Sequence, residues 1–100
     1  MAGEASRHDR PTAYQLLVVA DADPDLLAKV ANAVLVTNRL PRAATMLQHG
    51  EGVAEVAIEL EGADAEAAAR IARNLGRVTS IRDVSLFGCR ATGFERIDIP

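Results

Sequence analysis

The stretch VAEVAIELEGADAEAAARIARNLG, residues 53–76, decides the fold of this chain. Its first nine residues alternate, with apolar side chains at the even positions and three glutamates among the odd ones. A period of two with one charged side predicts a half-buried antiparallel strand. Gly62 ends this run, Asp64 is placed to cap a following helix, and Gly76 is placed to end it. Within that helix one apolar stripe is formed by Ala68, Ile71, Ala72 and Leu75.

The first half of the chain repeats this helix. Residues 23–34, DPDLLAKVANAV, align with residues 64–75, DAEAAARIARNL, in the capping aspartate, the acid two positions later, the base at the seventh position and the apolar stripe. Strands are expected at 13–20, 42–48, 53–61 and 81–87, and helices at 24–37 and 65–75. Two strand–helix–strand units in tandem predict an α+β fold, a ferredoxin-like βαββαβ sandwich with a four-stranded antiparallel sheet and two helices on one face.

Length and composition limit the possible functions. We expect a flexible leader over residues 1–12, one domain over 13–88 and a C-terminal tail over 89–100. The net charge of −3, the pI of about 5.3 and only three aromatic residues disfavour binding to nucleic acid or to an anionic membrane. There is no apolar run of signal-peptide or membrane-spanning length, so a cytoplasmic location is expected. The single cysteine, Cys89, excludes an internal disulfide.

The sequence contains no catalytic or metal-binding constellation. There is no glycine-rich phosphate loop, no nucleophile elbow and no metal-like spacing of histidine or cysteine. The two histidines fall in the leader and in a turn. Asp21, Asp23 and Asp25 alternate but lack the later Gly and Glu of a calcium loop, so we assign them to helix capping. Neither catalytic residues nor metal ligands are therefore predicted.

Two features predict contact with another chain. The first strand is apolar on both sides, so Leu17 and Val19 point away from the expected helix layer and need a cover. Pro41 fits the start of an edge strand. We expect a homodimer or partner interface formed by Leu17, Val19, Arg42, Ala44 and Met46.

From Tyr14 to Phe87 the chain resembles an ACT domain, the ferredoxin-like module that regulates amino-acid metabolism. Within that group it is most similar to the small regulatory subunits of acetolactate synthase (acetohydroxyacid synthase), of the short, single-module type. The residues that carry the resemblance are VVADADPDLLAKV (18–30), residues 53–62, LGRV (75–78) and IRDV (81–84).

The resemblance implies a non-catalytic regulatory or activating subunit in branched-chain amino acid biosynthesis, which forms a homodimer and binds the large catalytic subunit. The thiamine diphosphate, FAD and magnesium of that enzyme would belong to the large subunit, and this chain would hold no cofactor. An amino-acid effector would bind near the first strand–helix turn and after the first helix, at Asp23, Pro24, Asp25, Leu26, Leu27, Asn38 and Leu40.

This chain departs from the family at that effector site. The family's glycine corresponds to Asp25, and its asparagine falls at Leu40. Pro24 removes an N–H group and Asp25 adds a negative charge where an effector carboxylate would lie, so valine insensitivity is expected. The alternative is a free-standing ACT sensor that binds an amino acid and acts on another enzyme or regulator. An acylphosphatase-like enzyme is disfavoured by the acidic turn, and an RNA-binding module by the lack of stacking aromatics.

Overall fold

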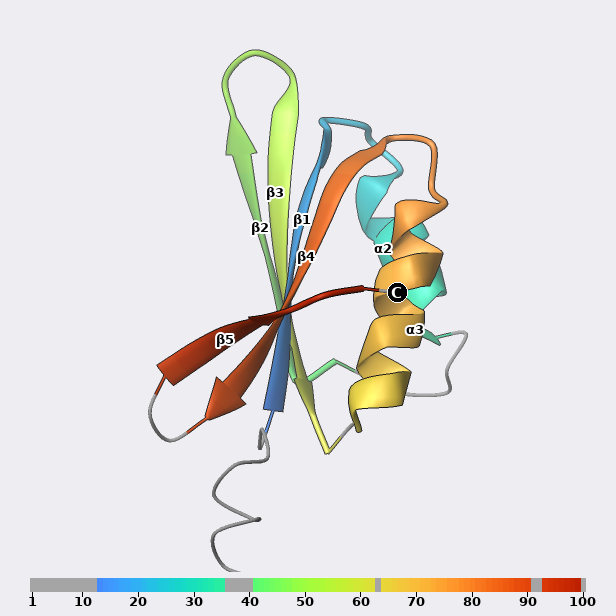
Figure 1. Ribbon diagram of the computed structural model, residues 1–100. Coiled ribbons are helices and arrows are strands. Elements are labelled where there is room, and N and C mark those ends of the chain that lie inside the picture. Colours follow the sequence, from blue (N-terminus) through green and yellow to red (C-terminus); the bar gives the residue numbers. More distant parts are fainter. Residues whose placement is uncertain (1–12, 36–40, 63, 91–92, 100) are drawn as a thin grey trace, which may run out of the picture.

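The computed structural model describes residues 13–35, 41–62, 64–90 and 93–99. In chain order the elements are β1 (Ala13–Asp21), α2 (Leu26–Leu35), β2 (Ala43–His49), β3 (Val53–Glu61), α3 (Ala65–Gly76), β4 (Ile81–Arg90) and β5 (Gly93–Ile97). The five strands form one antiparallel sheet in the order β2-β3-β1-β4-β5, and both helices lie on the same side of it (Figure 1). The predicted α+β class is confirmed, and the arrangement is compatible with a ferredoxin-like fold.

The prediction of four strands is wrong. We expected the last strand to end at Phe87, but β4 continues to Arg90 and β5 returns beside it from Gly93. Gly93 has φ 129°, a conformation that favours glycine at this reversal. The sequence of β5, GFERI, has too little apolar alternation to be recognised as a strand. Its pairing with β4, rather than its own propensity, makes it one.

The core lies between the helices and the central strands. The register brings Leu16 of β1 opposite both Ile58 of β3 and Leu86 of β4, and all three are fully buried. The side chain of Asp64 accepts a hydrogen bond from the N–H of Ala67 at 2.7 Å, as expected of a helix N-cap. The buried residues of the helices are Leu26, Val30, Ala33, Val34, Ala68, Ala69, Ile71, Ala72 and Leu75.

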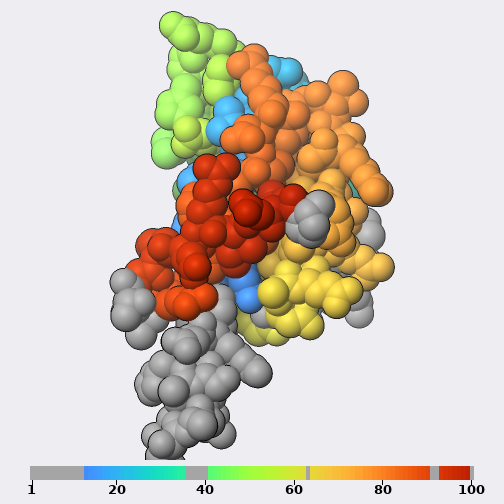
Figure 2. Space-filling view, in the orientation of Figure 1, coloured from blue at the N-terminus to red at the C-terminus, as the bar shows by residue number. Residues whose placement is uncertain are grey.

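The two edges of the sheet, β5 and β2, differ in how the chain covers them. Ile97 at the end of β5 and Ile99 just after it pack against the core, and the C-terminal segment lies against α3 (Figure 2). On the other side β2 is an edge strand whose seven residues are all exposed, and the β2–β3 hairpin projects past the helices (Figure 1). One lateral seam of the sandwich is therefore covered by the chain itself, whereas no segment among the described residues covers the seam beside β2.

Among the described residues, neither helix is long and apolar enough to cross a membrane.

Candidate functional site

The turn between β1 and α2 is organised by the Asp23 side chain. One carboxylate oxygen, Oδ1, accepts a hydrogen bond from the N–H of Asp25 at 2.9 Å, and the other, Oδ2, lies 2.5 Å from Lys29 Nζ. Ser80, which is buried in the connection between α3 and β4, places its Oγ 3.2 Å from Lys29 Nζ and 3.3 Å from Asp23 Oδ2. These three side chains join two connections that are far apart in the sequence.

The electrostatics of this cluster follow from its hydrogen bonds. The hydrogen bond from Lys29 holds the pKa of the Asp23 carboxyl below its ordinary value, and the N–H of Asp25 acts in the same direction. The same pairing raises the pKa of the Lys29 ammonium, with a smaller contribution from the charge of Asp25. Both groups therefore stay charged across the neutral range.

Helix α2 begins two residues later than predicted, and this changes the expected effector site. The helix begins at Leu26 rather than Pro24, because Pro24 and Asp25 form a turn. The N–H of Leu26 donates to the carbonyl of Asp23 at 3.0 Å, the N–H of Asp25 is taken by the Asp23 carboxylate, and Pro24 has none. The chain thus engages with its own oxygens the N–H groups of Asp25 and Leu26, two of those that a bound carboxylate would use.

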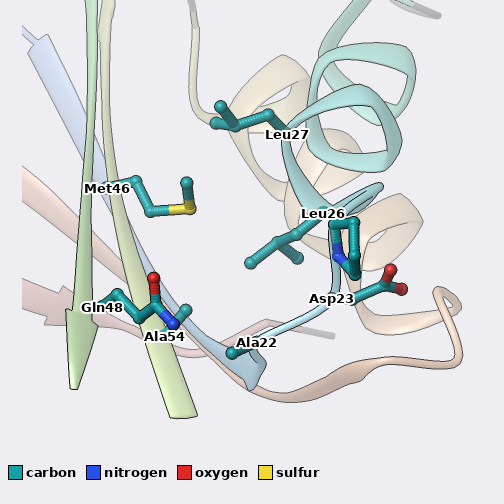
Figure 3. A pocket seen from close by; sticks show the side chains of 8 residues that line it. Ala22, Asp23, Leu26, Leu27, Met46, Gln48 and Ala54 are labelled. Carbon is teal, nitrogen blue, oxygen red and sulfur yellow. The ribbon is translucent and has the colours of Figure 1, made fainter. Parts of the chain in front are cut away.

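A groove runs between α2 and β2, and we call it the α2–β2 groove. It consists of two hollows of about 270 Å³ each that share Leu27. In the first, Leu26 and Leu27 lie across from Met46 and Gln48, while the Asp23 carboxylate points away from them (Figure 3). The first hollow is completed by Ala22, Pro24 and Ala54, and the second is lined by Leu27, Val30, Ala31, Val34, Leu35, Pro41, Ala44 and Ile58.

The groove is apolar and partly open to water. Leu27, Leu35 and Met46 are 52%, 48% and 42% exposed. Among the described residues that line the two hollows, Gln48 offers the one uncharged polar side chain. Large apolar side chains left in water around a groove are typical of a surface that another molecule covers.

The structure brings together part of the predicted effector site. Asp23, Pro24, Leu26 and Leu27 line the first hollow, whereas Asp25 is not among the lining residues. Asn38 and Leu40 lie outside the described residues. Sequence reasoning missed Gln48, which reaches this place because β2 pairs with β3, and it missed the partnership of Lys29 with Ser80, 51 positions later.

The predicted interface residues divide between two separate surfaces. Ala44 and Met46 line the α2–β2 groove on the helix side of the sheet. Leu17 and Val19 alternate with the buried residues of β1 and therefore point to the opposite face. Arg42 precedes β2, with its Nε 3.5 Å from a carboxylate oxygen of Glu61. The residues predicted to form one interface thus lie on two surfaces. One is the β2 edge with the α2–β2 groove, and the other is the face of the sheet opposite the helices.

The described residues contain no cluster of three or more histidine, cysteine, aspartate or glutamate side chains that could hold a metal ion. Burial raises the pKa of the Cys89 thiol, and the charge of Glu59 adds to this effect. A raised pKa disfavours the thiolate, so Cys89 has little nucleophilic character.

No protein-family model matches this chain, and no curated protein matches it. Among solved structures, the uncharacterized protein TM1266 from Thermotoga maritima is similar, with a TM-score of 0.65 and 15% sequence identity. The match covers 81% of this chain and 100% of that chain. At this level of identity the likeness concerns the fold alone.

Proposed function

We propose that this protein is a non-catalytic regulatory subunit that forms a homodimer through β2 and the α2–β2 groove and binds an enzyme partner. The observation that carries the proposal is an exposed apolar groove beside an exposed edge strand. Exposed edges of this kind are covered in stable assemblies, because their unpaired backbone groups and apolar side chains otherwise promote aggregation.

The sequence of β2 supports its role as a dimer edge. AATMLQH contains no lysine, arginine, carboxylate or proline, the residues with which monomeric proteins protect an edge strand. The opposite edge, β5, carries Glu95 and Arg96, and Glu95 is paired with Arg90 at 2.6 Å. A second copy related by a two-fold axis would pair β2 with β2 in antiparallel fashion and bury Leu27, Leu35 and Met46 from both copies.

The identity of the partner rests on the resemblance to acetolactate synthase small subunits. We propose the large subunit of that enzyme as the partner, with thiamine diphosphate, FAD and magnesium bound there. A subunit of this kind activates by binding the active arrangement of the catalytic chain more tightly than the inactive one. The satisfied N–H groups of the β1–α2 turn favour a regulator that is insensitive to valine.

A second candidate function is a free-standing ACT sensor of amino acids. The first hollow favours it, since Gln48 offers an amide beside Leu27 and Met46 in a space of about 270 Å³. Such a space suits a small apolar ligand held by few polar contacts. The two candidates differ in whether the groove closes on a second copy alone or also on a ligand.

The test is to mix the purified protein with the acetolactate synthase catalytic chain of the same organism and to measure co-elution and acetolactate formation. We expect a complex and a rise in activity. Met46→Lys is expected to yield a monomer by light scattering, because a charge at the groove would be buried in the dimer. Absence of any complex would exclude this enzyme as the partner, and an unchanged dimer in Met46→Lys would exclude the groove as its interface.

A further inference from the structure

The side of the sheet opposite α2 and α3 is covered by no described element, and we call it the open face (Figure 1). The strand register arranges seven of its apolar side chains in one diagonal band that crosses all five strands. Leu17 lies directly opposite Ala57 on β3, and Cys89 lies opposite Phe94 on β5. From β2 to β5 the band consists of Leu47, Val19, Ala57, Leu17, Phe87, Cys89 and Phe94.

The band is more than a scatter of single exposed residues. Its two ends, Leu47 and Phe94, are 59% and 68% exposed, and its middle members are half-buried. From Leu47 to Phe94 it spans four strand spacings and about six residues along β1, roughly 28 Å. This is the length of an α-helix of about 18 residues, or of one extended segment lying across the sheet.

Most charges along the band are acidic, and the exception is Arg96 on β5, which lies opposite Phe87. Glu59 and Glu61 border it on one side and Asp83 on the other, while Glu55 lies between Leu47 and Val19 in the register. Among the described residues no ion pair engages Glu59 or Asp83. Glu55 and Glu61 lie 3.5 Å from the His49 imidazole and the Arg42 guanidinium, and all four side chains are exposed. Pairs of this kind contribute little.

Two simple two-fold arrangements of a second copy are unfavourable on this face. A two-fold axis parallel to the strands through Leu17 would set Glu55 of one copy against Asp83 of the other. An axis perpendicular to the strands through the same point would set Glu55 against Glu59. Both arrangements oppose carboxylates, and like charges brought together at an interface are unfavourable. A partner that supplies cations beside apolar side chains is complementary to the open face.

We propose that the open face binds an amphipathic basic segment of the partner polypeptide, with apolar side chains along the band and lysine or arginine beside Glu59, Glu61 and Asp83. This inference rests on the proposed function in one respect, that the partner is the catalytic subunit. It separates the two interfaces: the α2–β2 groove serves the second copy, and the open face serves the enzyme. A regulatory dimer would then present two such faces, one for each catalytic chain.

The first experiment does not depend on the identity of the partner. The isotope-labelled protein is titrated with a helical peptide of leucine and lysine in an amphipathic pattern, and with the matched peptide of leucine and glutamate. We expect the lysine peptide to shift the amide signals of Leu17, Ala57 and Phe87 and the glutamate peptide to leave them unchanged. Equal binding of both peptides, binding of neither, or shifts confined to the α2–β2 groove would overturn the proposal.

Two charge reversals of equal size sharpen the titration. Glu59→Lys, on the open face, is expected to weaken binding of the lysine peptide roughly fivefold, the effect of losing about one exposed ion pair. Glu66→Lys, on α3 at the helix side of the molecule, makes the same change in net charge and is expected to leave binding unchanged. Equal weakening by both variants would show a long-range effect of net charge rather than a docking surface, and would refute the assignment.

The second experiment measures the affinity of the same two variants for the catalytic chain. We expect Glu59→Lys to lower this affinity and Glu66→Lys to preserve it. If the wild-type protein binds but both variants bind equally well, the open face is not the enzyme-binding surface while the proposed function stands. If the wild-type protein does not bind, the proposed function fails, and the peptide titration alone decides whether the open face binds basic segments.

Discussion

Replacing Leu26 by alanine is expected to destabilise the protein strongly, whereas the same change at its neighbour Leu27 is expected to act mainly on dimerisation. The two leucines are adjacent in the first turn of α2 and line the same hollow. Leu26 is 1% exposed and belongs to the core, while Leu27 is 52% exposed. The pair therefore separates what the core contributes from what the α2–β2 groove contributes.

The magnitudes follow from these exposures. Truncating a fully buried leucine removes its transfer free energy and leaves a cavity, about 2–5 kcal/mol in total. Because Leu26 lies at the edge of the groove, where its surroundings can relax, we expect about 3 kcal/mol. Leu27 has about half of its side chain in water, so its loss is limited to about 1 kcal/mol, and the higher helix propensity of alanine offsets a few tenths of that.

The assay is urea unfolding followed by circular dichroism at two protein concentrations, because dimerisation adds a concentration-dependent term to apparent stability. Light scattering on the same samples reports the oligomeric state. We expect Leu26→Ala to lower the free energy of unfolding by about 3 kcal/mol, a large part of the 5–15 kcal/mol typical of a domain. Leu27→Ala is expected to shift the sample toward monomer. Equal destabilisation by the two variants would refute the assignment of Leu26 to the core and Leu27 to the groove.

Three further predictions concern the turns and their charges. Asp23→Asn is expected to destabilise the protein at neutral pH. The difference in the free energy of unfolding between the variant and the wild type should close as the pH falls below about 4. The reason is that the pKa of Asp23 is lowered in the folded state, so the stabilisation from its carboxylate is present above the unfolded pKa and is lost on acidification. Urea midpoints measured at several pH values check this, and a pH-independent gap would contradict it. Calorimetric titration with valine is expected to give no binding heat, because the chain already satisfies the N–H groups of the β1–α2 turn, and a saturable heat would show that reasoning to be wrong. Glu51→Gly is expected to stabilise the protein by about 0.5–1 kcal/mol, since Glu51 has φ 76°, whereas Gly52→Ala at φ 74° should destabilise it by about 1 kcal/mol; thermal melts that rank the two variants in the opposite order would refute this.

Where an element carries its own periodic pattern, its prediction came close to the structure. The strand expected at 53–61 is β3 with the same bounds, and the helix expected at 65–75 is α3, which ends one residue later. The first helix is shorter than expected at its start, because Pro24 and Asp25 belong to the turn. A proline is compatible with both a first helical residue and a turn, so the residue type could not distinguish the two.

The fifth strand and the division of the predicted interface between two surfaces escaped prediction for the same reason. β5 forms because β4 extends along β1 and offers a neighbour with which residues 93–97 can pair. Likewise Leu17 and Met46 appear in one interface by sequence, but the sheet separates them onto two faces. Pairing between strands is a long-range relation, and local patterns carry little information about it.

The sequence by itself determined the α+β class, the tandem helices, the capping of α3 by Asp64 and the excess of apolar residues on β1, because each depends on periodicity or on local hydrogen bonding. Only the tertiary structure decided that Asp23, Lys29 and Ser80 meet, that one seam of the sandwich is covered by the C-terminal segment, and that β2 is an exposed edge strand. These features arise from contacts between residues far apart in the chain, and such contacts exist only once the strands have paired and the helices have packed against the sheet.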